Sequence, residues 1–139
     1  EFEQVYMKDV LEHLSDTIKT MEELHRITKP KAKIYITVPY WNSCTALGDP
    51  THIKLFNEFS FNAYDPDEWL CKERPYYTTA RFKINQIGVW IIPFFPMFSI
   101  PKISRDYLIV NSFVKKIIMS LANIFSNVVH TLDIHLERV

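Results

Sequence analysis

The residues best suited to chemistry lie in two short segments, Glu12-His13 and an Asp-Pro-Thr-His sequence at 49–52. An imidazole titrates near neutral pH, which makes His52 the best candidate for a general base. Asp49 is a candidate for the carboxylate that orients this imidazole. The alternative is that His52 only hydrogen-bonds Asp49 or a backbone carbonyl, and that the Asp-Pro pair forms an ordinary turn. We predict His52 and Asp49 as catalytic residues and keep the structural alternative open.

Glu12 and His13 follow the end of a strand that we predict at residues 2–7. In open α/β sheets, ligands lie outside the carboxyl ends of parallel strands, so this pair is placed to reach a binding pocket. A helix cap or a buried hydrogen-bonded pair is the alternative. The three other histidines have no metal-ligand spacing to one another or to a carboxylate, so we predict no metal site.

The elements that position these residues follow from the hydrophobic pattern. Apolar residues recur every three or four positions from 11 to 27, which predicts a short helical turn, a break and a main helix at 17–28. Ser15 and Asp16 are candidate N-caps for that helix. Residues 33–38 are β-branched and aromatic and predict a strand that stops at Pro39. A strand, a helix and a strand in this order predict a parallel βαβ unit.

Residues 40–77 lose this periodicity and are rich in aromatic and polar side chains. Long loops inside compact domains are usually functional. Within the loop, Asn57 and Ser60 are candidate caps for a short helix at about 57–64.

The last part of the chain predicts two strands separated by an insertion at about 89–129. The strands are expected at 80–87 and at 132–139, and the second alternates apolar and polar residues as an antiparallel strand with one wet face would. The insertion begins with a proline-broken apolar stretch at 90–98 and continues as a helix at about 107–128. We expect this helix to pack on the domain, and contact with a membrane surface is the weaker alternative.

Composition excludes several classes of protein. The 139 residues suffice for one domain, and 16 acidic residues balance 16 basic ones, so we expect no nucleic-acid partner. The only two glycines, Gly48 and Gly88, cannot form a GxG-type nucleotide loop. Two widely spaced cysteines favour a reduced, cytoplasmic setting.

Three segments carry a resemblance to a known family. They are Val-Leu-Glu-His-Leu-Ser-Asp at 10–16, Glu-Leu-His-Arg-Ile-Thr-Lys-Pro at 23–30 and Lys-Ile-Tyr-Ile-Thr-Val-Pro at 33–39. Together they resemble a class I S-adenosylmethionine-dependent methyltransferase of the type 11 group, over residues 1 to about 66. The Asp-Pro-Thr-His sequence is similar to a branch of that family. The resemblance implies an α/β fold: strands four to seven of a Rossmann-like methyltransferase sheet, the last one antiparallel, with a helical insertion.

The resemblance also implies a cofactor and a set of binding residues. S-adenosylmethionine would lie near Met7, Lys8 and Leu11, with Glu12 and His13 just beyond. The acceptor, a small molecule, a glycan or a lipid, would face the segment after the second strand and the loop aromatics, namely Tyr40, Trp41, Asn42 and Phe56. A satellite core beneath the loop is the alternative for these aromatics.

The chain departs from the family in two places. The family's Lys-Pro-Gly-Gly turn stands here as Lys-Pro-Lys-Ala at 29–32, so either the turn differs or Lys31 takes a left-handed conformation. The family's first three strands, its glycine-rich loop and its ribose-binding acid have no counterpart. We therefore expect the chain to be the C-terminal part of one methyltransferase domain and to be inactive alone.

Two other functions remain open. The chain could be a non-catalytic partner that self-associates through the open edge of the strand at 2–7. A weaker hypothesis is peripheral membrane contact through residues 90–100 and the helix that follows them.

Overall fold

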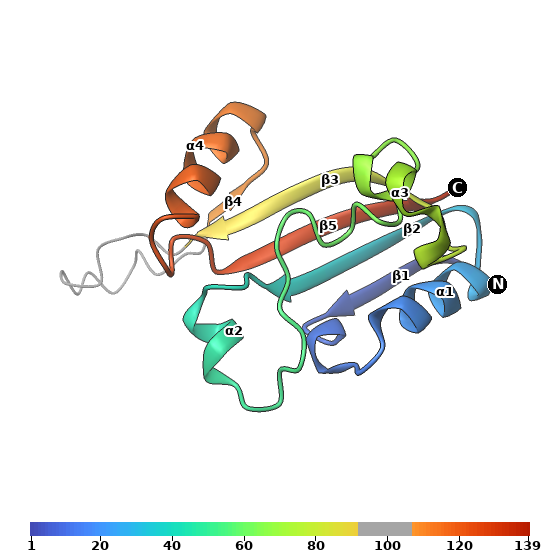
Figure 1. Cartoon of the computed structure of the whole chain (residues 1–139), viewed down its shortest axis with the longest axis horizontal. Helices are drawn as coiled ribbons and strands as arrows, with labels where there is room; N and C mark the ends of the chain where they lie inside the picture. The colour runs from blue at the N-terminus through green and yellow to red at the C-terminus, as the bar shows by residue number, and fades with distance from the viewer. Residues whose placement is uncertain (92–106) are drawn as a thin grey trace.

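A computed structural model describes residues 1–91 and 107–139. These residues form an α/β fold on a mixed, open five-stranded sheet with the order β1-β2-β5-β3-β4 (Figure 1). The strands are β1 (Phe2–Lys8), β2 (Thr28–Pro39), β3 (Phe82–Ile91), β4 (Tyr107–Ile109) and β5 (Thr131–Arg138). The helices are α1 (Thr17–Ile27), α2 (Cys44–Gly48), α3 (Trp69–Glu73) and α4 (Ser112–Ala122), with 3₁₀ turns η1 (Leu11–His13) and η2 (Pro75–Tyr77).

The predicted βαβ unit is confirmed, because β1 and β2 pair in parallel on either side of α1 in the chain. A short turn, η1, precedes the main helix as predicted. Asp16 is its N-cap, and its Oδ1 accepts a hydrogen bond from the backbone N–H of Lys19 at 2.9 Å. The helix ends at Ile27, and β2 begins at once with Thr28 rather than at Lys33.

The turn that lacks the family's glycines is a bulge within β2. Lys31 has a φ of 66°, in the left-handed region, and the β1–β2 register shifts between Phe2 and Gln4 opposite it. The second of the two alternatives for this turn is therefore confirmed. A residue with a Cβ occupies the left-handed region only at a cost, so Lys31 stores strain at this point.

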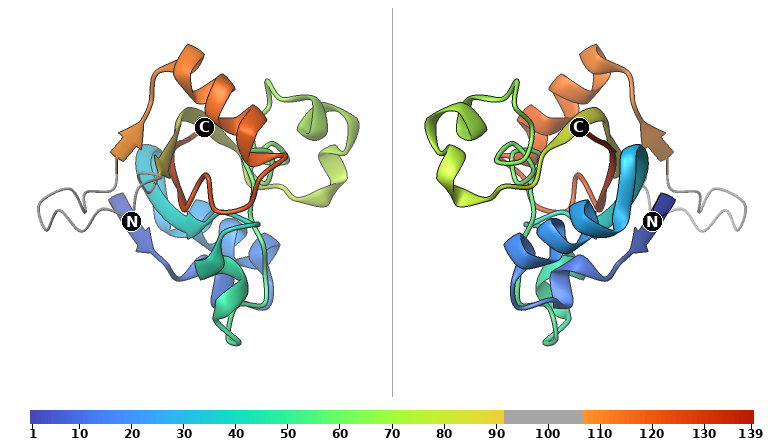
Figure 2. Two further views of the ribbon diagram at one scale, coloured as in Figure 1. Left: turned by 90° about the vertical axis from the view of Figure 1, so that its left-hand side faces the viewer. Right: turned by 90° about the vertical axis from the view of Figure 1, so that its right-hand side faces the viewer.

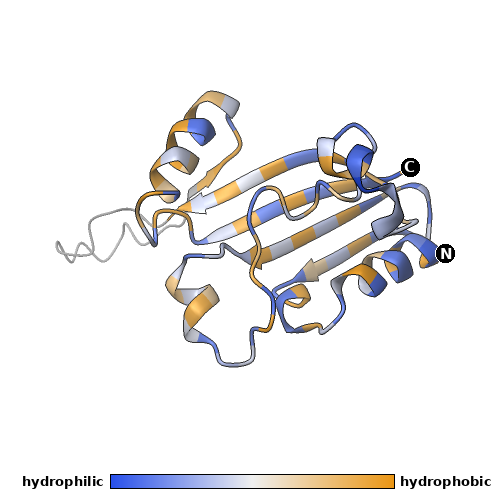
Figure 3. Ribbon diagram, viewed as in Figure 1, coloured by the Kyte–Doolittle hydropathy of each residue, from blue (hydrophilic) through white to orange (hydrophobic). Residues whose placement is uncertain are grey.

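The last strand, β5, is antiparallel as predicted and lies between β2 and β3. Leu132, Ile134 and Leu136 are buried, while the residues that alternate with them are partly exposed. This period of two places one face of β5 in the core, and the alternating colours along the strands show the pattern (Figure 3).

One face of the sheet carries the main hydrophobic core. The helix α1 and the loop segment with α3 lie on the same side of the sheet (Figures 1 and 2). They cover a core in which several side chains are at most 2% exposed, among them Met21, Ile34, Ile36, Phe56, Phe61 and Phe82.

The helix predicted at 57–64 is wrong, since these residues form turns. The reason is local hydrogen bonding by the two residues proposed as caps. Asn57 Oδ1 accepts from the N–H of Phe59 at 3.0 Å and from the hydroxyl of Ser60 at 3.1 Å, and Ser60 Oγ accepts from the N–H of Asn57. Asn and Ser that bond nearby backbone in this way compete with a helix.

The insertion also differs from the prediction. Residues 88–91 extend β3, and Tyr107–Ile109 form β4, which pairs with β3, instead of starting the helix. The helix begins after Asn111, whose Oδ1 accepts from the N–H groups of Phe113 and Val114, and it ends at Ala122. The proline-broken stretch at 90–98 lies beyond Ile91 outside the described residues.

Only part of α4 packs on the domain as expected. Met119 and Ala122 are buried, but most of the apolar stripe is exposed: Phe113, Val114, Ile117 and Leu121. Apolar residues that repeat with a period of 3.6 identify a helix, but they do not show which of its sides packs against the rest of the domain. In the part of the chain described here, no helix has the length and apolar character that a membrane span requires.

Candidate functional site

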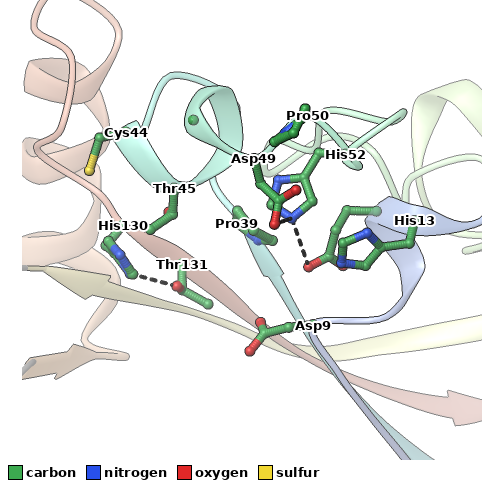
Figure 4. A pocket seen from close by; sticks show the side chains of 12 residues that line it. Asp9, His13, Pro39, Cys44, Thr45, Asp49, Pro50, His52, His130 and Thr131 are labelled. Atoms are coloured by element: carbon green, nitrogen blue, oxygen red, sulfur yellow. Dashed lines mark hydrogen bonds and ion pairs between the residues drawn. The ribbon is translucent and has the colours of Figure 1, made fainter.

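A pocket of about 560 Å³ lies where β1 and β2 end and β5 begins. Figure 4 shows the rings of His13 and His52 next to one another, with Asp9, Thr131 and His130 across the pocket. Its lining comes from η1, α2, the loop after α2 and the strand ends: Asp9, Glu12, His13, Pro39, Cys44, Thr45, Gly48, Asp49, Pro50, His52, His130 and Thr131.

Backbone hydrogen bonds hold the loop at 49–54 against η1. The carbonyl oxygen of Glu12 accepts from the N–H of Ile53 at 2.9 Å and from the N–H of Lys54 at 3.2 Å. These bonds join segments about 40 residues apart in the chain, and they bring the two sequence-predicted pairs of site residues into one cluster.

Glu12 is a buried carboxyl group that has no hydrogen-bond partner among residues 1–91 and 107–139. Its side chain is 1% exposed, and neither carboxylate oxygen is bonded within the described residues. Burial raises the pKa of Glu12, because a carboxylate loses its hydration in the protein interior. Unpaired buried polar groups are rare and call for a structural or functional explanation.

His52 points its Nε2 toward this carboxyl group. The Nε2 atom lies 3.9 Å from Glu12 Oε1 and 3.8 Å from Asp49 Oδ2, and Nδ1 lies 3.2 Å from the carbonyl oxygen of Ala46. A carbonyl oxygen can only accept, so Nδ1 is the donor, and in the neutral imidazole Nε2 then has the free lone pair. The hydrogen bond from His52 to the carbonyl of Ala46 is the kind of contact that a purely structural role for His52 requires. It leaves Nε2 available for other partners.

Asp49 is engaged mainly with its own loop. Its Oδ1 accepts from the N–H of Thr51 at 2.8 Å and from the hydroxyl of Thr51 at 2.6 Å. These hydrogen bonds lower the pKa of Asp49, with a smaller effect from His52. The carboxylate therefore shapes an Asx turn first, and its second oxygen faces His52 at a distance longer than a hydrogen bond.

His13 completes the cluster. Its Nδ1 lies 3.1 Å from Thr51 Oγ1 and 3.3 Å from the Thr51 carbonyl oxygen. The Thr51 hydroxyl donates its proton to Asp49, so His13 Nδ1 acts as the donor to Thr51. The rings of His13 and His52 meet edge to face, with centroids 4.7 Å apart.

A second cavity of about 300 Å³ adjoins the pocket and shares some lining residues with it. It is lined by Lys8, Asp9, Thr37, Trp90, His130 and Thr131. Lys8, expected near the cofactor, therefore lies beside the pocket rather than in it. Asp9 lines both cavities and has a φ of 52°, a conformation that Asp tolerates better than most residues.

The remaining predicted cofactor residues occupy the sheet and the core. Met7 is half-buried on β1, and Leu11, the first residue of η1, is fully buried. Neither is among the lining residues of the two cavities. Their assignment to the cofactor stays a prediction, and Leu11 acts here by supporting its neighbours Glu12 and His13.

The predicted acceptor residues have mainly structural contacts. Tyr40 and Phe56 are buried in the core, joined by a bridge between their two segments, and Phe56 stacks on Phe61. Asn42 Nδ2 donates to the carbonyl oxygen of Ala122 at 2.7 Å and so ties this loop to α4. Trp41 is exposed. Tyr40 and Phe56 thus belong to the main core rather than to a satellite core beneath the loop.

Sequence reasoning missed the pocket residues that come from separate strands. Asp9, His130 and Thr131 line the pocket and the adjoining cavity, and His130 Nδ1 lies 2.8 Å from Thr131 Oγ1. Asp9 could have been found, because it directly follows a strand. The other two could not, because their position depends on β5 lying beside β2.

Comparison with known proteins does not extend this description. Neither a known protein family nor a curated protein matches the chain. A functional assignment must therefore come from the pocket itself and from the resemblance of the three sequence segments.

Proposed function

We propose that the chain forms part of a class I S-adenosylmethionine-dependent methyltransferase, with a small molecule, a glycan or a lipid as the methyl acceptor. The single observation that supports this best is the position of the pocket. It lies at the carboxyl ends of the parallel strands β1 and β2, where open α/β sheets bind their ligands.

Two further features support the proposal. The three segments that carry the resemblance follow β1 and contain η1, the end of α1 and most of β2, and Lys31 has the left-handed conformation where the family has glycine. The last strand is antiparallel, as a partial methyltransferase sheet requires. On this basis we assign the finer fold as strands four to seven of a Rossmann-like methyltransferase sheet.

The chemistry proposed is a displacement at a methyl carbon. A nucleophilic atom of the acceptor forms a bond to the methyl carbon, the bond from that carbon to the sulfonium sulfur breaks, and S-adenosylhomocysteine leaves as a neutral thioether. Such a step depends on proximity and alignment more than on acid–base groups. The proposal therefore does not depend on His52 as the proton acceptor.

The test is nitrogen–proton correlation NMR of the chain titrated with S-adenosylhomocysteine, and separately with adenosine. Because the chain has no glycine-rich loop, we expect weak binding, with a Kd of about 1 mM or above. The perturbed amide signals should belong to Asp9, Glu12, His13 and Thr131. Thr131→Trp, which fills the pocket, should abolish these shifts, and Thr79→Trp on an exposed loop should not.

The location of the shifts and the strength of binding test different parts of the proposal. Shifts that map elsewhere would overturn the methyltransferase assignment. Micromolar binding would support the choice of cofactor. It would also show that the pocket binds it without the glycine-rich loop and the ribose-binding acid, contrary to what the resemblance implies.

The exposed edge of β1 favours a second candidate, a non-catalytic subunit that self-associates. Within the described residues β1 pairs only with β2, and the side chains of Phe2 and Tyr6 on it are more than half exposed. An unpaired edge with exposed aromatics is a template for strand addition. Sedimentation equilibrium should then show a dimer that Tyr6→Lys dissociates, whereas a monomer at all concentrations would exclude this function.

A further inference from the structure

Glu12, His13 and His52 bring three potential metal ligands to one end of the pocket. One ligand atom from each side chain lies within 4.8 Å of the other two. In a tetrahedral zinc site with bonds of about 2.0–2.1 Å, neighbouring ligand atoms lie about 3.3 Å apart, so they need to approach by about 1.5 Å at most.

The carboxyl group of Glu12 provides an observation independent of this spacing. It is 1% exposed, it has no hydrogen-bond partner among the described residues, and it is directed at His52. A hydrogen bond to His52 does not explain it, because 3.9 Å is too long. A bound cation would give this carboxylate a partner that it lacks among the described residues.

The hydrogen bonds of the two imidazoles suit metal binding. The Nδ1–H group of His52 donates to the carbonyl of Ala46, and that of His13 donates to Thr51. In its neutral form each ring is then the tautomer with a free lone pair on Nε2. Metal-binding histidines are typically held in this way, with the second nitrogen bonded to a carbonyl or hydroxyl group.

The backbone holds the cluster together. Glu12 and His13 are adjacent on η1, and the carbonyl of Glu12 bonds the N–H of Ile53, the residue that follows His52. The three ligands therefore come from two segments that are fastened to one another. This limits the rearrangement needed for binding, and the pocket leaves one side of the cluster accessible.

We infer that Glu12, His13 and His52 bind a divalent transition-metal ion, and that one coordination position faces the pocket, where an oxygen of the pocket's ligand can occupy it. Two imidazoles and one carboxylate fit Zn²⁺ and its neighbours in the first transition row. Mg²⁺ and Ca²⁺ prefer oxygen ligands throughout. The inference holds whether or not the pocket belongs to a methyltransferase. It also takes His52 out of the general-base role, because a metal-bound nitrogen has no lone pair for a proton.

The test is calorimetric titration of ZnCl₂ into the tag-free, EDTA-treated chain, with MgCl₂ as a parallel titration. We expect a single Zn²⁺ per chain with a micromolar Kd and no heat from Mg²⁺. Co²⁺ in place of Zn²⁺ should give intense visible absorption bands, which report nitrogen and oxygen ligands in a site of low coordination number.

Variants identify the ligands. Glu12→Gln and His52→Gln should each weaken Zn²⁺ binding more than about 100-fold, since loss of an outer-shell partner alone costs about 10–100-fold. The matched control is His135→Gln, because His135 also has a carboxylate neighbour, with its Nε2 3.3 Å from Asp133 Oδ1. It should leave Zn²⁺ binding unchanged.

Three results would overturn the inference: no Zn²⁺ binding by the wild-type chain, equal loss in the control and the cluster variants, or binding that survives both cluster variants. Circular dichroism checks that each variant folds. If one does not, NMR of the wild-type imidazole nitrogens decides the question. Zn²⁺ must shift Nε2 of His13 and His52 and leave His135 unshifted, and any other pattern contradicts the site.

Discussion

Replacing Asp65 by alanine should destabilise the chain strongly. Asp65 lies in the long loop and is 2% exposed. Its Oδ2 accepts from the N–H of Ile84 at 2.7 Å, beside the bulge in β3, and its Oδ1 accepts from the N–H of Asp67 at 2.9 Å. The carboxylate therefore joins the loop to the sheet.

The magnitude follows from these contacts. The short bond from Ile84 to a charged, buried acceptor is worth about 1.5–3 kcal/mol, and the bond from the exposed Asp67 about 0.5–1 kcal/mol. The ion pair with Lys83, at 3.9 Å, adds little because the Lys83 side chain is 46% exposed. Asp65→Ala should thus lower the free energy of unfolding by about 3 kcal/mol, or the Tm by about 10 °C for a domain of this size.

The assay is urea denaturation followed by circular dichroism, with the slope m compared between proteins. Asp65→Asn keeps one acceptor and should lose about half as much stability. Lys83→Ala is the matched control and should change stability by less than about 1 kcal/mol. A change below about 0.5 kcal/mol for Asp65→Ala would refute the reasoning, because the backbone contacts would then contribute little. An equal loss in Lys83→Ala would also refute it, because the ion pair rather than the backbone contacts would then dominate.

Two further predictions concern single residues. Lys31→Gly should raise the free energy of unfolding by about 0.5–1 kcal/mol, because glycine adopts the left-handed φ of 66° without strain. Lys33→Gly, in the regular part of β2, is the control and should lower the free energy of unfolding. Thermal unfolding measures both variants, and a loss of stability in Lys31→Gly would contradict the strain at this position. Burial raises the pKa of Tyr64 to about 12, so tyrosinate absorbance should show a late-titrating phenol that Tyr64→Phe removes. Because its pKa is raised in the folded state, Tyr64 stabilises the fold below pH of about 10, and about 2–3 kcal/mol should be lost as the pH rises to about 12. Burial also raises the pKa of Tyr40, so the assignment is rejected if Tyr64→Phe titrates as many late phenols as the wild-type chain does.

The local pattern of apolar residues determined the β1–α1–β2 unit and the antiparallel β5. A period of 3.6 and a period of two are properties of neighbouring residues, so they can be detected before any contact is known. The left-handed conformation of Lys31 was one of two alternatives that the sequence offered, because lysine and alanine replace the two glycines of the family's turn. Boundaries were less accessible, because β2 and β3 extend as far as their partner strands allow.

The turn at 57–64 and the uncovered side of α4 depend on choices that the pattern does not record. Asn57 was expected to cap a helix and instead bonds Ser60 and Phe59 in a turn. Met119 is buried while Phe113 is exposed on the same helix. In the first case local side-chain hydrogen bonds compete with helix formation. In the second case the packing of the rest of the domain decides which side of the helix is buried.

For the candidate site, the sequence by itself identified side chains that can do chemistry in two segments, Glu12-His13 and residues 49–52. The tertiary structure decided that Glu12 and His13 meet His52, because only the folded loop closes against the carbonyl of Glu12. It also decided that the carboxyl group of Glu12 has no hydrogen-bond partner among the described residues, since burial depends on every element packed around it. Spacing along the chain contains neither fact, which is why a metal site was not expected from the sequence and is inferred from the fold.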